Sequence, residues 1–333
     1  MLIEPGKTEL VEIARPALDR GEVLVKIKAA LTCGTDLKAF KQGHPVIPMP
    51  GVFGHEFSGV VAETGKGVKK FREGDEIMSV HSAPCLECRY CRKNLFNLCE
   101  QIMYSKILGA FAEYILLPPH IVRQNAFLKP KNLLFEEAAF LEPLSCVVHG
   151  MASLDIRKGD HALVIGAGPI GLLHLLLLKE KGAIVSVADK HNSKLKTAKL
   201  LGTDFLHNAS SPSYLPVCES GIGFDYVFEC TGIPEVWEAS VDYLRRGGTA
   251  VLFGGCKTGT RVTYDAGRIH YDEITLKGVF HYTPSDVQRA YHLLRKQSID
   301  VKPLISGSYP LKHTQKAFED LSKGKGIKYA IIP

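Results

Sequence analysis

The chain has 333 residues, enough for two domains with separate hydrophobic cores, and its 45% hydrophobic and 23% charged content is typical of a globular protein. The formal net charge of +6 is mild, and no basic run is dense enough to predict a nucleic-acid-binding surface. The longest apolar stretch, residues 172–178, is too short to cross a bilayer, and the N-terminus lacks the pattern of a signal peptide. We therefore expect a cytoplasmic protein with neither a nucleic-acid nor a membrane partner.

Apolar and polar residues alternate in the first part of the chain. This alternation predicts strands over residues 22–28, 57–63 and 75–80. Gly and Pro are dense between these runs, as at 48–51 and 65–67, and mark turns. Together they predict a compact antiparallel, barrel-like domain.

A first candidate metal site lies within this β-rich part. Cys33 follows a predicted strand, and His55 and Glu56 follow about twenty residues later. A thiolate, an imidazole and a carboxylate can form an open zinc site whose remaining position takes water or a substrate oxygen. Taken singly, a lone Cys is more often buried and inert, and a His-Glu pair is more often on the surface.

A second candidate metal site is the run Cys85-x2-Cys88-x2-Cys91-x7-Cys99. Four closely spaced thiolates match a closed tetrahedral zinc site. The alternative is a pair of disulfides or free surface thiols. The other four cysteines outside the two candidate sites show no pairing pattern, and a reducing compartment fits all nine.

The pattern changes near residue 142 from alternating strands to apolar strands separated by helices. Pro143 suits the first turn of a helix over 142–154. Strands are predicted over 161–165, 184–189, 226–229, 250–253 and 274–278. A helix to about residue 181 is predicted between the first two of these strands, and a further helix over 286–296. Such alternation predicts a parallel doubly wound sheet. We therefore expect an α/β protein, with one domain over 148–283 and the other over 1–147 and 284–333.

A glycine-rich turn follows the strand at 161–165. It has the sequence Gly166-Ala167-Gly168-Pro169-Ile170-Gly171, the G-x-G-x-x-G pattern of a dinucleotide site. The first Gly makes the turn, the second admits the pyrophosphate, and the third allows close helix–strand packing. The helix N-terminus that follows supplies N–H groups and partial positive charge.

Cofactor choice depends on Asp189, at the end of the next predicted strand. A carboxylate there can accept hydrogen bonds from both ribose hydroxyls and repels a 2′-phosphate, so NAD is favoured over NADP. Lys190 follows directly and keeps NADP as the minority prediction.

The order of these motifs, with Glu142-Pro143-Leu144 between the cysteine run and the glycine loop, resembles the zinc-dependent medium-chain alcohol and polyol dehydrogenases. The resemblance covers essentially the whole chain. It implies a GroES-like catalytic domain that carries a structural zinc lobe over 85–99, a Rossmann coenzyme domain, and an active site in the cleft between them.

The resemblance also implies roles for individual residues. Cys33 and His55 match two catalytic zinc ligands, and Glu56 matches a carboxylate that binds zinc in the sorbitol-type members. Glu142 matches a position that is Cys in liver-type alcohol dehydrogenases and Glu in polyol and threonine dehydrogenases; whether it would bind zinc directly or through water stays open. Thr35 matches the hydroxyl that takes the substrate proton.

Further matches concern the structural zinc and the nicotinamide. Four cysteines match the structural zinc ligands, and three later residues match positions that flank the nicotinamide; these seven are Cys85, Cys88, Cys91, Cys99, Gly254, Val279 and Phe280. The resemblance thus implies two zinc ions per chain and a homo-oligomer, dimer or tetramer.

The chain departs from the family pattern at three places. The expected proton-relay His is Lys38 here, so the proton must leave through water, Lys38 or another group such as His44. The segment 108–114 is shortened. His281 stands at a position that lies near the nicotinamide in members of the family. We expect its side chain to be solvated rather than in contact with the substrate.

The predicted reaction is hydride transfer between NAD and a secondary alcohol, with a polyol favoured as the substrate. L-threonine is the first alternative, although Ser82 stands where the threonine enzymes have a His, and His81 is one position off. A phosphorylated polyol is another alternative. An alternative of a different class is a non-catalytic relative that binds nucleotide, against which the retained Cys33, His55 and Glu56 argue.

Overall fold

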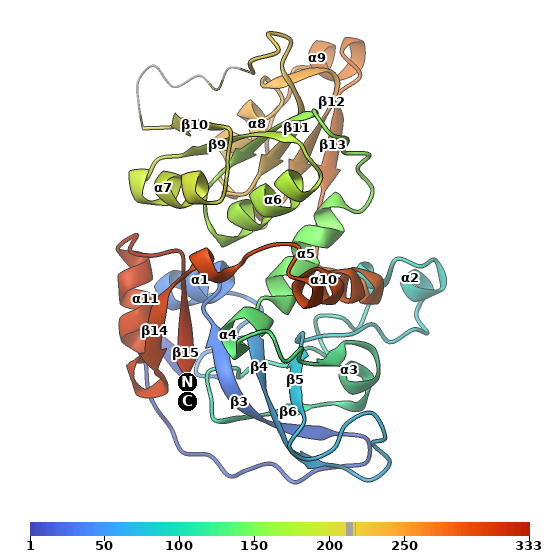
Figure 1. Ribbon diagram of the computed structural model, residues 1–333, viewed down its shortest axis with the longest axis vertical. Helices are drawn as coiled ribbons and strands as arrows, with labels where there is room; N and C mark the ends of the chain where they lie inside the picture. Colours follow the sequence, from blue (N-terminus) through green and yellow to red (C-terminus); the bar gives the residue numbers. More distant parts are fainter. Residues whose placement is uncertain (211–215, 217) are drawn as a thin grey trace. The chain divides into compact units, whose positions relative to one another are not determined.

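The computed structural model describes residues 1–210, 216 and 218–333 of the chain (Figure 1). These residues form two compact units, one made of Met1–Cys146 with His281–Pro333 and the other of Val147–Phe280. The first unit is discontinuous in sequence, because the chain leaves it once and returns. Each unit has its own main sheet and its own hydrophobic core.

A mixed sheet organises the first unit. Its strands lie in the order β14-β15-β3-β4-β5-β7, with β6 paired to β3. Neighbouring strands are antiparallel, except that β14 and β15 are parallel. Their bounds are β3 (Val23–Leu31), β4 (Glu56–Thr64), β5 (Glu76–Ser79), β6 (Tyr114–Leu117), β7 (Ala126–Leu128), β14 (Ile305–Pro310) and β15 (Lys328–Ile332), and a separate two-stranded sheet pairs β1 (Leu2–Glu4) with β2 (Lys7–Thr8).

Short helices surround this sheet. They are α1 (Gly34–Gln42), α2 (Arg89–Arg92), α3 (Pro119–Gln124), α4 (Phe135–Ala138), α10 (Pro284–Lys296) and α11 (Thr314–Ser322), with 3₁₀ turns η1 (Phe96–Leu98), η2 (Lys302–Leu304) and η3 (Leu311–His313); α5 (Leu141–Met151) begins in the first unit and ends in the second. Thr283 and Asp286 form a capping box that starts α10: each side chain accepts a hydrogen bond from the other residue's backbone N–H.

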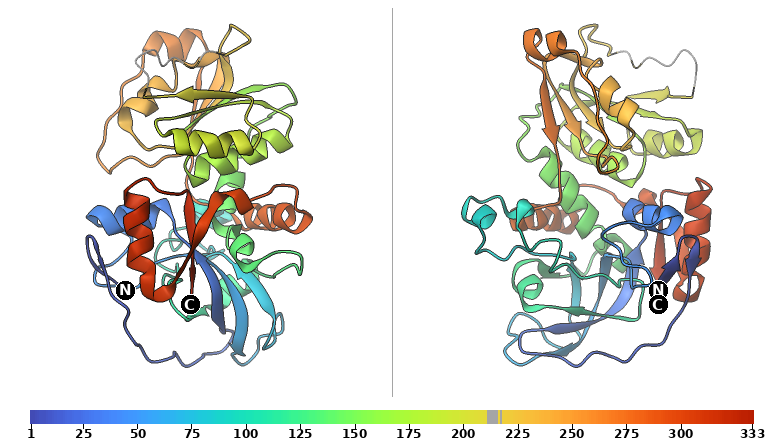
Figure 2. Two further views of the ribbon diagram at one scale, coloured as in Figure 1. Left: turned by 60° about the vertical axis from the view of Figure 1, so that its left-hand side comes forward. Right: turned by 180° about the vertical axis from the view of Figure 1, so that it is seen from behind.

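Four aromatic rings join the two ends of the chain in the core of the first unit. Phe40 on α1, Phe53, Phe111 and Phe318 on α11 pack with ring centroids 4.8–5.6 Å apart. Each ring is buried, and aromatic pairs at these distances add to the free energy gained from burial alone. The chain termini lie close together on this unit, as Figures 1 and 2 show.

The second unit contains six parallel strands in the order β10-β9-β8-β11-β12-β13. This is the Rossmann order, with the switch point between β8 and β11. The elements are β8 (His161–Ile165), α6 (Pro169–Glu180), β9 (Ile184–Asp189), α7 (Asn192–Leu200), β10 (Phe205–Asn208), β11 (Phe224–Glu229), α8 (Pro234–Ala239), β12 (Leu244–Leu252), α9 (Ala266–Tyr271) and β13 (Thr275–Gly278). Helices α6 and α7 cover one face of the sheet and α8 the other (Figure 2). The predicted doubly wound parallel sheet is confirmed.

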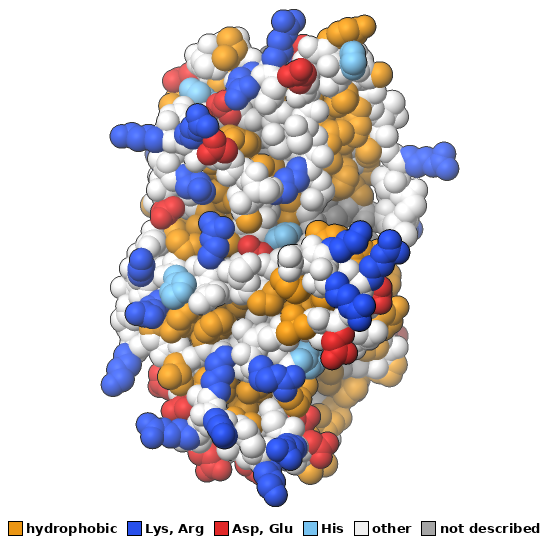
Figure 3. All heavy atoms as spheres, turned by 90° about the vertical axis from the view of Figure 1, so that its right-hand side faces the viewer, with side chains coloured by type: hydrophobic (Ala, Val, Ile, Leu, Met, Phe, Trp, Pro, Cys, Tyr) orange, Lys and Arg blue, Asp and Glu red, His pale blue; other side chains and the backbone are white. Residues whose placement is uncertain are grey.

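Lys and Arg side chains on the face in Figure 3 are interspersed with hydrophobic and acidic ones. Among the described residues, no helix has both the length and the apolar character needed to cross a membrane.

Candidate active site and zinc-binding residues

Strand pairing brings the first candidate metal ligands together. Leu31, at the end of β3, pairs with Glu56, at the start of β4. Cys33 lies two residues beyond Leu31 and His55 one residue before Glu56, so all three donors reach the same end of the sheet. The donor atoms of Cys33, His55 and Glu56 lie within 4.8 Å of one another. We refer to these three residues as the metal cluster.

Two charged residues that the sequence analysis did not single out support the metal cluster. The fully buried carboxylate of Asp36 lies 3.4 Å from Nδ1 of His55. The buried ammonium of Lys328, on β15, donates to Glu56 Oε2 and to the carbonyl oxygen of Thr32. No sequence pattern indicates Lys328, because its partner lies 272 positions away.

The donor set fits a zinc ion. Nδ1 of His55 faces Asp36, which leaves Nε2 of the imidazole available as a ligand. None of the residues that the structure describes donates a hydrogen bond to the buried Glu56 Oε1, whereas Oε2 is held by Lys328. A buried carboxylate oxygen without a partner is costly unless a cation satisfies it.

The charges in this cluster act strongly on one another. Burial alone would lower the pKa of His55, but Asp36 and the Cys33 sulfur raise it well above its usual value. Burial raises the pKa of Glu56, and the Lys328 ammonium opposes that rise. The pKa of Lys328 is raised despite its burial, because Glu56 stabilises the ammonium form.

Glu142 lies beside the metal cluster, but its carboxylate is not among the donor atoms that lie within 4.8 Å of one another. Its Oε1 lies 3.3 Å from His81 Nδ1 and 3.8 Å from Cys146 Sγ. Burial would raise the pKa of Glu142, but the hydrogen bond from His81 and the nearby imidazoles lower it to about 2. The carboxylate is therefore ionised at neutral pH. Direct zinc binding by Glu142 stays a prediction.

His81 belongs to a hydrogen-bonded network that the sequence analysis did not foresee. The Tyr282 hydroxyl lies 3.3 Å from His81 Nδ1 and 2.9 Å from Ser82 Oγ. Ser82 Oγ in turn lies 2.6 Å from Nε2 of His281. The His281 ring stacks on Tyr282 at 4.0 Å, and its backbone adopts the left-handed region with φ of 61°. His281 is therefore partly buried and hydrogen-bonded within the first unit, rather than simply solvated.

The predicted proton-relay residues lie on or near α1. Thr35 is half-buried in the first turn of α1, and Lys38 is exposed one turn later. His44 is half-buried, and its Nδ1 accepts a hydrogen bond from the Val46 N–H. Burial and the neighbouring Lys38 charge lower the pKa of His44. Their roles stay predictions.

The second cysteine group has the geometry of a closed zinc site. All four sulfurs lie within 4.8 Å of one another, with Cys85 Sγ 3.5 Å from that of Cys99 and 4.0 Å from that of Cys91. Sulfurs in a tetrahedral zinc site with ordinary bond lengths are about 3.8 Å apart. Backbone N–H groups of Cys88 and Gln101 donate to the sulfurs of Cys85 and Cys99, respectively. The described cysteines are all free, so the disulfide alternative finds no support.

The backbone geometry of the glycine loop explains why its first and third glycines are needed. Gly166 has φ of 101°, and a Cβ on Gly171 would overlap the carbonyl oxygen of Gly166. Gly168, by contrast, faces open space. It starts α6 with no side-chain cap, so the first N–H groups of the helix remain available to an anion. Pro169 and Ile170, the two residues between the last glycines, form the first turn of α6.

Asp189 contacts this loop directly. Its Oδ2 accepts a hydrogen bond from the Ala167 N–H at 2.8 Å, and its Oδ1 accepts one from the His191 N–H at 2.7 Å. Each oxygen keeps a lone pair for a ribose hydroxyl. Lys190 points to solvent.

The three residues predicted to flank the nicotinamide lie at the carboxyl ends of β12 and β13. The Gly254 carbonyl accepts a hydrogen bond from the Trp237 indole, and a Cβ on Gly254 would clash with Gly232. Val279 follows β13, and Phe280 is 48% exposed. Ligands of doubly wound sheets bind beyond the carboxyl ends of the strands, which is consistent with a cofactor role for these residues.

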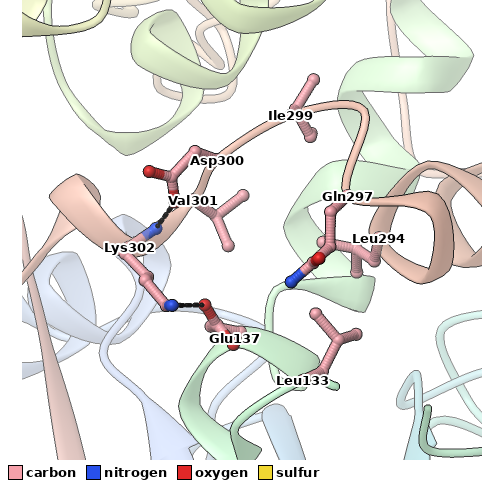
Figure 4. A pocket seen from close by; sticks show the side chains of 8 residues that line it. All are labelled: Leu133, Glu137, Leu294, Gln297, Ile299, Asp300, Val301 and Lys302. Atoms are coloured by element: carbon pink, nitrogen blue, oxygen red, sulfur yellow. Dashed lines mark hydrogen bonds and ion pairs between the residues drawn. The ribbon is translucent and has the colours of Figure 1, made fainter. Parts of the chain in front are cut away.

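A pocket of about 250 Å³ in the first unit lies away from all these residues (Figure 4). Its charged groups are paired within the pocket: Lys302 Nζ lies 3.3 Å from Glu137 Oε1, and Asp300 accepts the Lys302 N–H. No predicted site residue lines it, so it is not the candidate active site.

Comparison with known proteins identifies the family. Residues 19–126 match the alcohol dehydrogenase GroES-like domain, and residues 169–296 match the zinc-binding dehydrogenase domain. The chain is 32% identical to sorbitol dehydrogenase of Bos taurus, over 98% of this chain and 93% of the relative. It is also 32% identical to D-arabitol-phosphate dehydrogenase of Enterococcus avium, over 98% of this chain and 95% of the relative.

A solved structure shows the same fold over the full length. A zinc-binding dehydrogenase of Sinorhizobium meliloti 1021, solved with NADP bound, superposes with a TM-score of 0.90 at 29% identity and covers 100% of this chain and 98% of its own. The predicted combination of a GroES-like domain and a Rossmann domain is thereby confirmed. With the metal cluster, the cysteine lobe and the glycine loop in place, the chain belongs to the zinc-dependent medium-chain alcohol dehydrogenase family.

Proposed function

We propose that this enzyme oxidises a polyol at a secondary hydroxyl, with NAD as the hydride acceptor. The observation that carries the proposal is the donor set Cys33, His55 and Glu56, with a buried Glu56 oxygen for which the described part of the chain supplies no hydrogen-bond donor. Relatives named sorbitol dehydrogenase and D-arabitol-phosphate dehydrogenase support a polyhydroxylated substrate.

The metal cluster would hold a zinc ion, which as a Lewis acid lowers the pKa of an alcohol. Asp36 and Lys328 fix the orientation of His55 and Glu56 for that purpose. The hydroxyl of Thr35 would accept the alcohol proton. The hydride would pass to the nicotinamide, whose chemistry belongs to the cofactor. Glu142, held ionised beside the cluster, adds negative charge and a hydrogen-bond acceptor that suit a polyol better than a simple apolar alcohol.

The lobe cysteines would hold a second, structural zinc, which gives two zinc ions per chain. Asp189 favours NAD, because a carboxylate at the ribose repels a 2′-phosphate. The free cysteines fit a reducing cytoplasm, and family resemblance favours a homo-oligomer, either dimer or tetramer.

A substrate panel tests this proposal. Purified enzyme is given sorbitol, xylitol, arabitol, their phosphates, L-threonine and simple secondary alcohols, each with NAD and with NADP, and reduced cofactor is followed by absorbance. We expect the highest kcat/KM with a free polyol and NAD. A preference for threonine or a polyol phosphate would replace the substrate assignment, and absence of turnover with every alcohol would favour the non-catalytic alternative.

A further inference from the structure

A continuous line of hydrogen-bonding groups runs outward from the surroundings of the metal cluster. It starts at His81, which contacts Glu142, and continues through the hydroxyls of Tyr282 and Ser82 to the imidazole of His281. The four groups are joined by contacts of 3.3, 2.9 and 2.6 Å.

Burial changes along this line. The inner groups are nearly inaccessible, with Ser82 0%, Tyr282 1% and His81 6% exposed, whereas His281 is partly exposed. A chain of hydroxyls that is closed to solvent along its length and ends at a partly exposed imidazole can connect a buried site to water. All of its members belong to the first unit.

The donors and acceptors can be assigned in one consistent direction. A carboxylate such as that of Glu142 accepts hydrogen bonds, so the shared Nδ1 of His81 carries the proton and faces both Glu142 Oε1 and the Tyr282 oxygen. The Tyr282 hydroxyl then donates to Ser82, and the Ser82 hydroxyl donates to Nε2 of His281. Beyond His81, both hydroxyl donors of this path therefore point away from the metal cluster toward His281.

A strained backbone holds the outer end in place. His281 adopts φ of 61°, a region that is unfavourable for residues with a Cβ, and its ring stacks on Tyr282 with an interplanar angle of 23°. Such strain costs free energy and persists where surrounding contacts enforce it, often at functional sites. Here the Ser82 hydrogen bond and the Tyr282 ring fix the imidazole at the end of the chain.

We propose that Tyr282, Ser82 and His281 carry the proton released by alcohol oxidation from the active site to solvent, with His281 as the outer acceptor. This rests on the proposed dehydrogenase function. The alcohol proton, first accepted by Thr35, would reach the imidazole of His81 through water. The Nδ1 proton of His81 then passes to Tyr282 as the Tyr282 proton passes to Ser82 and the Ser82 proton to Nε2 of His281. His281 then releases a proton to water, and reversal of the hydrogen bonds resets the chain. No electrons move, and water is the sole co-reactant.

The path would do what the family's relay His does elsewhere, since Lys38 occupies that position here and is exposed on α1. The test compares wild type with His281→Ala on whichever secondary alcohol the wild type oxidises, at low and high concentrations of buffers that do not bind metals. His292→Ala, an exposed His on α10, is the matched control.

We expect His281→Ala to lose about 100-fold in kcat at low buffer, the scale of a lost proton-transfer group, and to regain most of it as buffer concentration rises. Zinc content and NAD affinity should match wild type, and His292→Ala should be unaffected. Ser82→Ala should also lower kcat, while Ser82→Thr, which keeps the hydroxyl, should retain it.

An undiminished kcat in His281→Ala, or a loss that buffer does not restore, would overturn the relay. A buffer-independent loss with normal zinc content would show a structural role. An incorrect polyol assignment would appear differently, as a wild-type preference for another alcohol.

Discussion

At the scale of single residues, the charges around the metal cluster come from distant parts of the chain. The motif residues Cys33, His55 and Glu56 are evident from the sequence because they lie within short, recognisable patterns. Lys328 is not, since a lone Lys in a C-terminal strand resembles many surface lysines until the β15–β3 pairing places it behind Glu56. His281 is a further example, because its contact with Ser82 joins residues 199 positions apart.

Asp36 should control how tightly the catalytic zinc is held. Its buried carboxylate faces His55 Nδ1, and loss of such a partner weakens metal sites by about 10–100-fold. Asp36→Asn should therefore lose one zinc to a chelator at a lower concentration than wild type, with the fold retained by circular dichroism. Asp155→Asn, an exposed carboxylate paired with Arg157, serves as control. Unchanged chelator resistance in Asp36→Asn would refute this role.

Asp189 should determine the cofactor preference. Removing its carboxylate in Asp189→Ala takes away the acceptor for the ribose hydroxyls and the charge that repels a 2′-phosphate. We expect the KM for NAD to rise about 10-fold or more and the KM for NADP to fall, with kcat less affected. Steady-state kinetics with both cofactors measure the change. A parallel rise in both KM values would indicate that Asp189 supports the loop, through its bond to Ala167, rather than selecting the cofactor.

At the scale of elements, hydrophobic patterning predicted the strands that form the two sheet centres. It missed the polar half of β12, where Arg245 pairs with Asp225 on the neighbouring strand at 2.6 Å. It also missed α1, which starts at Gly34 directly after Cys33, because its apolar positions are few and its packing against α11 depends on Phe40 and Phe318. The local pattern of apolar residues thus predicts buried central strands. Elements that are stabilised by partners distant in sequence cannot be predicted from that pattern and become evident only in the folded structure.

Helix α6 carries a buried His174 that should make the second unit sensitive to acid. Burial lowers the pKa of His174 from 6.5 to about 4, and its ring lies between Phe228 and Phe253. Because the folded pKa is below the unfolded one, the unfolded state binds the proton first, and stability is lost as pH falls from 6.5 towards 4.

His174→Phe removes this titration. Between pH 7 and about pH 5, the wild type should lose about 2 kcal/mol more unfolding free energy than the variant, measured by urea denaturation at both pH values. His292→Ala should behave as wild type. Equal acid losses in wild type and His174→Phe would show that His174 does not contribute.

At the scale of the whole molecule, the candidate functional groups are divided between two compact units. The first unit carries both candidate zinc sites and the hydrogen-bonded chain to His281, and the second carries the glycine loop and Asp189. The cysteine lobe has a small hydrophobic cluster of its own, formed by the buried residues Cys91, Cys99 and Ile102. A zinc ion bound there by four thiolates would stabilise the structure of the lobe rather than take part in the reaction.

Zinc stoichiometry measured together with turnover tests the central claim most directly. Wild-type enzyme should contain two zinc ions per chain by elemental analysis and reduce NAD with a polyol. Cys33→Ser should keep its fold and one zinc, and lose nearly all turnover, because the lobe site remains while the metal cluster is disrupted. A wild type that oxidises polyols with zinc in the lobe alone, or a Cys33→Ser variant with full turnover, would contradict the account.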